Sequence, residues 1–424
     1  NEEKLSIKIA CIDIGGGTTD LMVTTYFQEE EETLVPCQEF REGFRVAGDD
    51  LLSEVISSVI LPRLKDTISN ASTPEIDAKF KNLFGLNVAN ISEQQKQRRR
   101  QFGLRILTPI AVALLERSLQ CIPDMNISIS EVFKSENNEN PPESLIDFLQ
   151  EDIRAIGYPD WSLISQELSF THGEIEAIFE RLFGVLISNI SEVVHQLNVD
   201  TVLLTGRPSI HPIVRQMLVN SCIVPPNRVI AMHDYHTGSW YPFRNNQNKV
   251  GDPKGTVAVG AMLIAMSDRN IPNFHIPLNE FKMKSTSKYI GRMDIDGKIR
   301  NQNVYFKPDD KDDEAEITIK MNTPMFIGSR QLNVERWKTS QLYHLDFVKE
   351  PGPRPYEVTI KRRAPANDND DEYTLAAEAI KESFEITEVV DRDGKSVRLD
   401  GLKLSLQTLR DNGDYWLDTG CFIP

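Results

Sequence analysis

The chain has 424 residues, more than a single hydrophobic core usually serves, so we expect two or three packed units. With 40% hydrophobic and 26% charged residues it has the composition of a globular protein, and no stretch approaches the roughly 18 apolar residues of a membrane span. A formal charge of −16 argues against a nucleic-acid partner, because such partners need clustered cations.

The sequence carries no sign of secretion or of a disulfide scaffold. Its first residues, NEEKLSIK, lack the apolar core and the cleavage site of a signal peptide. The five cysteines lie far apart and never form a CxxC pair. We therefore expect a cytoplasmic protein without an integral membrane segment, and export by a route independent of a signal peptide stays open.

The N-terminal part predicts a small sheet followed by a helix. Residues 5–13, 21–27 and 33–40 are expected to form three strands joined by tight connections. A helix should follow Asp49 and Asp50, because apolar residues then recur at helical spacing and the two carboxylates favour a helix start. From about residue 70 to residue 157 the pattern is mostly helical and charged, which indicates an inserted helical subdomain.

A strand–helix alternation resumes after the insertion. Thr171 and Glu174 form a capping box in front of a long apolar helix. Strands are expected near 199–206 and 227–233, each followed by a helix, at about 209–220 and 255–266. This order predicts an α/β domain over residues 1–268, and short alternating runs with many prolines predict a β-rich C-terminal domain over 269–424.

The most informative stretch is IACIDIGGGTTDLMV, residues 9–23. Three consecutive glycines let backbone N–H groups approach a ligand with no Cβ in the way, which suits phosphate oxygens. A carboxylate faces phosphate only through a cation, so Asp13 and Asp20 indicate Mg²⁺, and Thr18 adds a hydroxyl donor. The alternative is a hairpin turn in which the glycines serve geometry alone.

Three companion segments favour the phosphate interpretation. VAGDD opens a helix at residues 46–50, LLTGRPS follows a later strand at 203–209, and VAVGAML lies on a helix at 257–263. Together with the glycine turn, this order resembles the actin, sugar-kinase and Hsp70 superfamily, over roughly residues 5–268. The resemblance implies an actin/Hsp70-like, ribonuclease H-like lobe with a helical insertion, and ATP with Mg²⁺ as cofactors.

The resemblance also implies roles for individual residues. Asp13 and Thr18 would be the catalytic residues, and Asp13 and Asp20 would hold the metal ion. Phosphate and adenosine would be bound by a further set: Gly15, Gly16, Gly17, Thr18, Thr19, Gly48, Gly206, Arg207 and Ser209. Catalysis would then consist mainly of positioning and charge stabilisation, as phosphoryl transfer requires.

A second resemblance is to the SrfB-type virulence-factor family. It is based on LLTGRPS and on TPMFIGSRQLNVERWKTSQLYHLDF, residues 323–347. That family has no established activity, so the resemblance implies relatives and no reaction.

The sequence departs from the superfamily pattern at three points. No other D-x-G-x-x-T loop is present, so the chain resembles the second lobe and C-terminal region of a longer protein. The three residues that grip adenosine in Hsp70-type chains fall on Arg105, Thr108 and Pro109. Arg207 replaces the second glycine of the adenosine turn, and it could either cover the base or pair with an internal carboxylate.

The histidine-rich segment MHDYHTGSWY, residues 232–241, brings two histidines and an aspartate close together in the sequence, which raises the question of a metal site. In an extended segment His233 and His236 project to opposite faces. This favours a polar loop near the nucleotide cleft over a shared ion.

Two functional hypotheses follow. In the first, the chain is the second lobe of an ATP-binding protein that could also hydrolyse ATP and whose β-rich domain binds a protein partner. This chain alone would have little or no ATPase activity, because half of the catalytic groups would be missing. In the second, the chain is a structural or scaffolding protein that keeps the fold without binding nucleotide.

Overall fold

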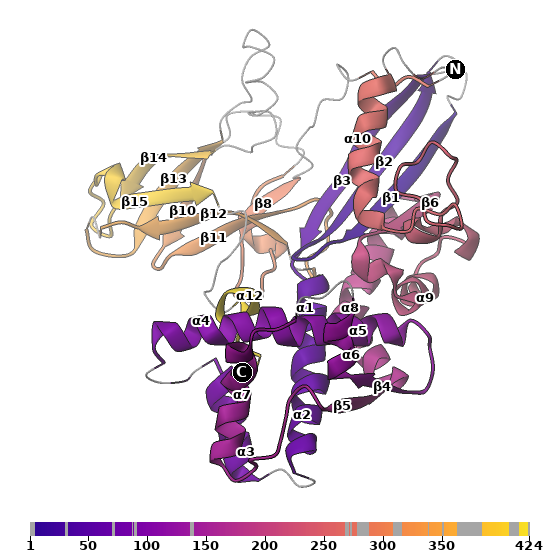
Figure 1. Ribbon diagram of the computed structural model, residues 1–424. Coiled ribbons are helices and arrows are strands. Elements are labelled where there is room, and N and C mark those ends of the chain that lie inside the picture. Colours follow the sequence, from indigo (N-terminus) through magenta and orange to yellow (C-terminus); the bar gives the residue numbers. More distant parts are fainter. Residues whose placement is uncertain are drawn as a thin grey trace.

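The computed structural model describes residues 5–29, 33–69, 73–86, 88, 91–135, 140–267, 271, 274–277, 288–307, 316–337, 339–349, 352–362, 384–406 and 415–422. Over these ranges the protein is a mixed α/β structure with several sheets (Figure 1). None of the helices described is long and apolar enough to cross a membrane.

A five-stranded mixed sheet forms the centre of the N-terminal part, in the order β3-β2-β1-β6-β7. Its first three strands, β1 (Ser6–Ile14), β2 (Thr19–Glu29) and β3 (Thr33–Phe44), pair antiparallel. Strands β6 (Thr201–Thr205) and β7 (Val229–Ala231) add to β1 in parallel. The predicted N-terminal strands are confirmed, and β2 and β3 run beyond their predicted bounds.

Helices cover this sheet through apolar faces. A continuous helical run is built from α1 (Gly48–Val55), the π-helical turn η1 (Ile56–Ile60) and α2 (Leu61–Ile68). The long helix α8 (His172–Gln196) packs against α1 and α9 (Pro212–Ser221). Its predicted capping box is confirmed, because the Glu174 amide donates to Thr171 Oγ1 at 3.2 Å and the Thr171 amide donates to the Glu174 carboxylate at 2.8 Å.

The insertion between α2 and α8 is mostly helical, as expected. It consists of α3 (Pro74–Phe84), α4 (Glu93–Phe102), the π-helical turn η2 (Gly103–Leu107), α5 (Thr108–Ser118), α6 (Ile129–Lys134) and α7 (Glu143–Ala155). The sequence did not predict the small antiparallel pair of β4 (Asp124–Ser128) and β5 (Glu167–Thr171). Phe80, Phe84 and Phe102 are fully buried in the same hydrophobic core as the central sheet. The described residues of the insertion therefore share the core of the central sheet.

The C-terminal part consists of strands, as its turn-rich sequence predicts. One sheet has the order β10-β13-β14 and the other the order β15-β12-β11-β8-β9. Their bounds are β8 (Tyr289–Arg292), β9 (Val304–Phe306), β10 (Glu316–Met321), β11 (Met325–Arg330), β12 (Ser340–Phe347), β13 (Tyr356–Arg362), β14 (Phe384–Val390) and β15 (Leu402–Leu406). Residues of both sheets, including Ile319, Leu345 and Tyr356, share one core, so the two sheets pack on each other.

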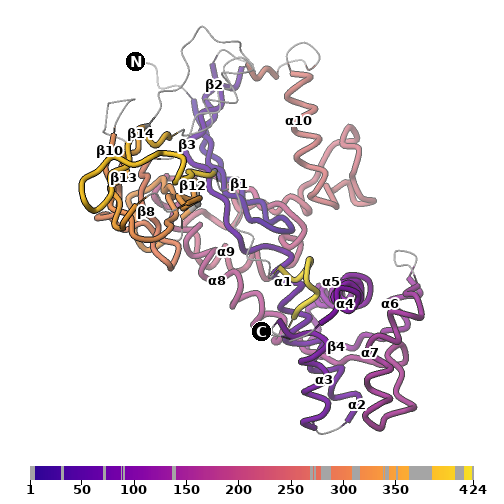
Figure 2. The backbone as a smooth tube through the Cα atoms, turned by 90° about the vertical axis from the view of Figure 1, so that its left-hand side faces the viewer, coloured from indigo at the N-terminus to yellow at the C-terminus, as the bar shows by residue number. Residues whose placement is uncertain are grey.

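Short helical turns complete the described chain. They are η3 (Arg207–Ile210), η4 (Pro226–Arg228), η5 (Met232–Asp234), η6 (Pro253–Gly255), η8 (Asn301–Asn303) and η9 (Leu399–Gly401). Helix α10 (Thr256–Ser267) lies on one side of the central sheet and the β-rich part on the other (Figure 2).

The end of the described chain returns to the helical insertion. After β15, helix α12 (Trp416–Thr419) lies beside α4 (Figure 1). Trp416 and Phe422 are buried in the core of the N-terminal part. The last described segment of the sequence therefore belongs to the N-terminal part, which we call the first unit; the β-rich part is the second unit.

Candidate functional site

The glycine turn between β1 and β2 caps helix α1. Within the turn, the Gly15 N–H donates to the Thr18 carbonyl oxygen at 2.9 Å. The carbonyl oxygens of Gly15 and Gly16 accept the N–H groups of Gly48 and Asp49, at 3.0 and 2.7 Å. The first amides of α1, which a phosphate could otherwise bind, are thus already engaged by the protein.

Two amides of the turn remain for a ligand. Among the described residues, neither the Gly16 nor the Gly17 N–H donates a hydrogen bond. Both glycines are exposed. Unpaired amides in an exposed glycine turn are the groups that bind anions in other proteins, so this part of the predicted phosphate cradle is open.

A second turn meets the first at the same edge of the sheet. Gly206 follows β6 with φ +87°, and a Cβ at this position would lie 2.0 Å from the Ile14 carbonyl oxygen and 2.8 Å from Asp13 Oδ1. A Cβ on Gly48 would lie 3.1 Å from both the Gly15 oxygen and Pro208 Cγ. The glycine turn, the start of α1 and the turn after β6 therefore converge, and glycine is required where β6 closes on β1.

The two predicted metal ligands lie opposite each other. Asp13 and Asp20 are paired across the β1–β2 hairpin. Burial, and then the charge of Asp20, raises the pKa of the half-buried Asp13 carboxyl. Asp20 is exposed and accepts a hydrogen bond from Thr18 Oγ1 at 3.1 Å.

The acidic groups would suit magnesium as a shared ion. Over the described ranges, no three Asp, Glu, His or Cys side chains cluster closely enough to hold a metal without other ligands. Mg²⁺ in phosphate sites is commonly held by one or two carboxylates, phosphate oxygens and water. Asp13 and Asp20 could contribute in that way, and they could not form a complete site alone.

The remaining predicted residues are engaged elsewhere. Thr19 is buried, and its hydroxyl donates to the Val46 carbonyl oxygen at 2.6 Å. Ser209 is buried and donates to the Gly206 carbonyl oxygen at 2.6 Å, so it braces the turn. Arg207 pairs with Glu116 at 3.4 Å with both side chains about 60% exposed, so its partner is a surface carboxylate and not an internal one. Thr108, one of the positions where the sequence lacks the adenosine grip, donates to the Gly103 oxygen at 2.9 Å.

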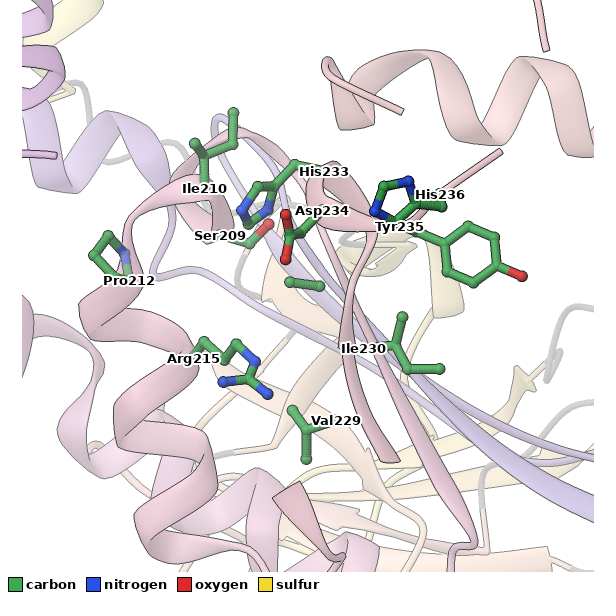
Figure 3. A pocket seen from close by; sticks show the side chains of 11 residues that line it. Ser209, Ile210, Pro212, Arg215, Val229, Ile230, His233, Asp234, Tyr235 and His236 are labelled. Atoms are coloured by element: carbon green, nitrogen blue, oxygen red, sulfur yellow. The ribbon is translucent and has the colours of Figure 1, made fainter. Parts of the chain in front are cut away.

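A pocket opens on the other side of the Gly206 turn. It has a volume of about 820 Å³ and lies between the start of α9, strand β7 and turn η5 (Figure 3). Its lining consists of Ser209, Ile210, Pro212, Arg215, Val229, Ile230, Ala231, His233, Asp234, Tyr235 and His236. The histidine-rich segment is therefore a polar pocket wall.

The charges of the pocket are partly neutralised by neighbours. Asp234 forms an ion pair with Lys249, whose hydrogen bond lowers the pKa of Asp234. Burial lowers the pKa of His233, so its imidazole is neutral at pH 7. Tyr235 and His236 are exposed rings at the pocket wall, and an aromatic base could stack on such rings.

Two residues at the glycine turn were missed by the sequence analysis. The Asp49 carboxylate lies over the turn, 3.5 Å from where a Cβ on Gly16 would be. The Tyr415 hydroxyl donates a hydrogen bond to this carboxylate. Asp49 was assigned only to the helix start, and nothing in the sequence pairs it with a residue 366 positions away.

The turns after β1 and β6 lie at the carboxyl ends of parallel strands, which is the usual ligand-binding edge of an α/β protein. By its sequence the chain belongs to the SrfB family: the family model described as "Virulence factor SrfB" matches residues 1–423. A comparison with curated proteins finds no match.

Proposed function

We propose that residues 1–268 form one lobe of an actin/Hsp70-like ATP-binding unit and that the glycine turn binds the phosphates. The observation that carries the proposal is that the glycine turn, which has two unpaired amides, meets Gly48 and the Gly206 turn at one edge of the sheet. The strand order β3-β2-β1-β6-β7, with an antiparallel meander extended by two parallel strands, supports it, because lobes of that superfamily share this order.

In this proposal the Gly16 and Gly17 amides donate to the β- and γ-phosphates. Asp13 and Asp20 hold Mg²⁺ through one oxygen each or through its water ligands. The ion would neutralise charge on the phosphates, and Asp13 would orient an attacking water. The role of Thr18 is to fix Asp20 through its hydroxyl group.

The base and ribose occupy the pocket beyond the Gly206 turn. Ser209 and Ile210 connect the two regions, because both line the pocket and follow the turn directly. Tyr235 and His236 supply stacking surfaces, which replace the adenosine grip that the sequence lacks at Arg105, Thr108 and Pro109. Arg207 follows the turn directly and pairs with Glu116 at the surface.

The rest of the protein has supporting roles. A second lobe, from a longer parent polypeptide, would complete the catalytic groups, so the chain alone has little or no ATPase activity. The β-rich part binds a protein partner, and the protein acts in the cytoplasm or after export without a signal peptide. These roles are the ones that the resemblance to the actin, sugar-kinase and Hsp70 superfamily implies.

A calorimetric titration of the full-length parent with ATP and Mg²⁺ tests the proposal. Heat of binding is expected for the wild-type protein and its loss for Asp13→Ala, while the exposed Asp160→Ala serves as the control for a removed charge. Tyr235→Ala should weaken ATP binding and leave the binding of magnesium pyrophosphate unchanged, because only the former needs the pocket. Equal binding by wild-type protein and Asp13→Ala would contradict the proposal.

A scaffold without nucleotide is the second candidate function. It is favoured by the Asp49 carboxylate over the glycine turn and by the engaged hydroxyl groups of Thr19 and Ser209. This candidate predicts no heat with ATP for the wild-type protein or for any variant, and unchanged thermal stability in the presence of ATP and Mg²⁺.

A further inference from the structure

The C-terminal segment Tyr415–Phe422 reaches the glycine turn through Asp49. The Tyr415 hydroxyl donates to the Asp49 carboxylate, and Trp416 Nε1 donates to the Asp49 carbonyl oxygen at 2.9 Å. Both contacts come from one end of α12, so the segment holds the side chain and the backbone of Asp49 together.

The segment is anchored firmly enough to position Asp49. The side chains of Trp416 and Phe422 are buried, with ring centroids 5.3 Å apart. The buried Arg99 donates to the Thr419 carbonyl oxygen at 2.8 Å, and the Phe422 N–H donates to the Phe84 oxygen at 2.9 Å. Tyr415 therefore has little freedom to move away from Asp49 while this segment stays in place.

The position of the Asp49 carboxylate matters because it lies beside Gly16 and Gly17, the two residues with open amides. A Cβ on Gly16 would lie 3.5 Å from both carboxylate oxygens, and one on Gly17 would lie 3.8 Å from Oδ2. A bare phosphate at the Gly16 and Gly17 amides would therefore meet a negative charge at close range. A divalent cation bound to the phosphate would neutralise part of its charge and so remove this repulsion.

We propose that Asp49 sets the metal requirement of the glycine turn and that Tyr415 positions it, so that the turn accepts polyphosphate only as its magnesium complex. The inference rests on the proposed phosphate-binding role of the turn. It adds a specificity-determining residue, Asp49, and a positioning residue, Tyr415, that lies 366 positions further along the chain.

The test compares ATP affinity with Mg²⁺ and with EDTA, by calorimetry on the full-length parent. The wild-type protein should bind ATP much more tightly with Mg²⁺. Asp49→Asn should bind metal-free ATP at least about tenfold more tightly than the wild-type protein does, since it keeps the size of the side chain and removes its charge. Tyr415→Phe keeps the ring and removes the hydroxyl group. It should lower the ratio of the ATP affinity with Mg²⁺ to that with EDTA, by a smaller factor than Asp49→Asn does. Tyr158→Phe is the control for loss of a phenol group.

Hydrogen–deuterium exchange without nucleotide provides a second measurement. Tyr415→Phe should speed exchange in peptides covering residues 15–18 and 48–52, because it frees Asp49, whereas Tyr158→Phe should not. Unchanged exchange in Tyr415→Phe would overturn the positioning role of Tyr415, whatever the outcome of the nucleotide titration.

The failures of the two proposals are distinguishable. In one outcome the wild-type protein binds magnesium–ATP, and Asp49→Asn and Tyr415→Phe have the same ratio of affinities with Mg²⁺ and with EDTA as the wild-type protein. The role of Asp49 and Tyr415 is then overturned, and the nucleotide proposal stands. If neither wild-type protein nor Asp49→Asn binds ATP in either buffer, the nucleotide proposal is overturned, and the metal requirement with it. The inference is supported if Asp49→Asn binds metal-free ATP and the wild-type protein does not.

Discussion

For Gly206, the neighbouring residues in the sequence predict part of its structural role. A glycine directly after a buried strand, in LLTGRPS, predicts a backbone that must approach something closely. The structure gives the reason, because a Cβ would fall on the Ile14 carbonyl oxygen. The identity of the neighbouring group was not predictable, since it depends on how β6 pairs with β1.

His211 is a residue whose environment the sequence did not indicate. Its side chain is 4% exposed, Nε2 lies 2.9 Å from Ser118 Oγ, and Nδ1 accepts the Ile213 N–H at 3.5 Å. Burial, with a smaller contribution from the charge of His172, lowers the pKa of His211 to about 4. The imidazole is thus neutral in the folded protein at pH 7.

We predict that this histidine makes the protein sensitive to acid. Between its ordinary pKa of 6.5 and about 4, the unfolded chain takes up a proton that the folded chain does not. Stability from this group is complete above pH 6.5 and falls as the pH drops to about 4, by at most on the order of 3 kcal/mol. Urea unfolding at pH 7 and pH 4.5 measures the difference.

His211→Gln should reduce this loss between the two pH values, although it also lowers stability at pH 7 by disturbing the buried hydrogen bonds. The exposed His195→Gln serves as the matched control, and its pH dependence should equal that of the wild-type protein. An undiminished difference between pH 7 and pH 4.5 in His211→Gln would show that another group causes the acid sensitivity.

At the scale of elements, local signals were reliable and long-range ones were absent. The capping box at Thr171 and Glu174 fixed the start of α8, because both of its hydrogen bonds lie within four residues. The pairing of β4 with β5 was missed, because it joins segments on either side of α6 and α7. A five-residue strand has little pattern of its own, so only its partner identifies it.

Helix α10 was predicted from its apolar sequence, but its exposure was not. Val259 is 5% exposed and packs with Tyr241 and Val250, whereas Val257 and Met262 on the same helix are 66% and 45% exposed. Apolar residues gathered on an exposed face commonly mark a binding surface for another protein or domain. The sequence alone cannot distinguish such a face from a core-facing one.

We predict that the two faces of α10 respond differently to a charge. Val259→Glu should destabilise the chain by about 3 kcal/mol or more, because it buries an unpaired carboxylate. Met262→Glu should change stability by less than about 0.5 kcal/mol. Both variants introduce the same residue into the same helix. Val→Glu slightly raises helix propensity and Met→Glu leaves it nearly unchanged, so propensity cannot cause a loss in Val259→Glu. Urea unfolding measures the difference. A large loss for Met262→Glu would mean that this face is covered within the chain.

At the scale of the whole molecule, the two parts are joined at more than one place. The Gln331 side chain accepts the Arg41 N–H at 2.8 Å and donates to the Glu42 carboxylate at 3.0 Å, which ties the β-rich part to strand β3. Trp337 Nε1 donates to Glu192 on α8 at 3.2 Å. The sequence predicted a change of character near residue 268, and it could not predict these contacts, because each joins residues more than 140 positions apart.

The return of the C-terminal segment to the first core has a consequence for stability. Trp416 and Phe422 belong to the core that contains β1, α1 and the insertion. The described residues that precede them in the sequence, 352–362 and 384–406, belong to the β-rich part. Losing the indole should therefore weaken the first unit and not the second, whose core lies around Tyr356 and Leu345.

Trp416→Ala is expected to lower the free energy of unfolding of the first unit by about 3–5 kcal/mol, the usual loss for removing a buried tryptophan. It also removes the hydrogen bond to the Asp49 carbonyl oxygen. Trp240→Ala, at a side chain 58% exposed, should change stability by less than about 0.5 kcal/mol. Urea unfolding, followed by hydrogen exchange in peptides of each core, separates the two units. Faster exchange in β13 and not in α1 of Trp416→Ala would contradict the assignment, because the segment would then stabilise the strands that precede it and not the core it contacts.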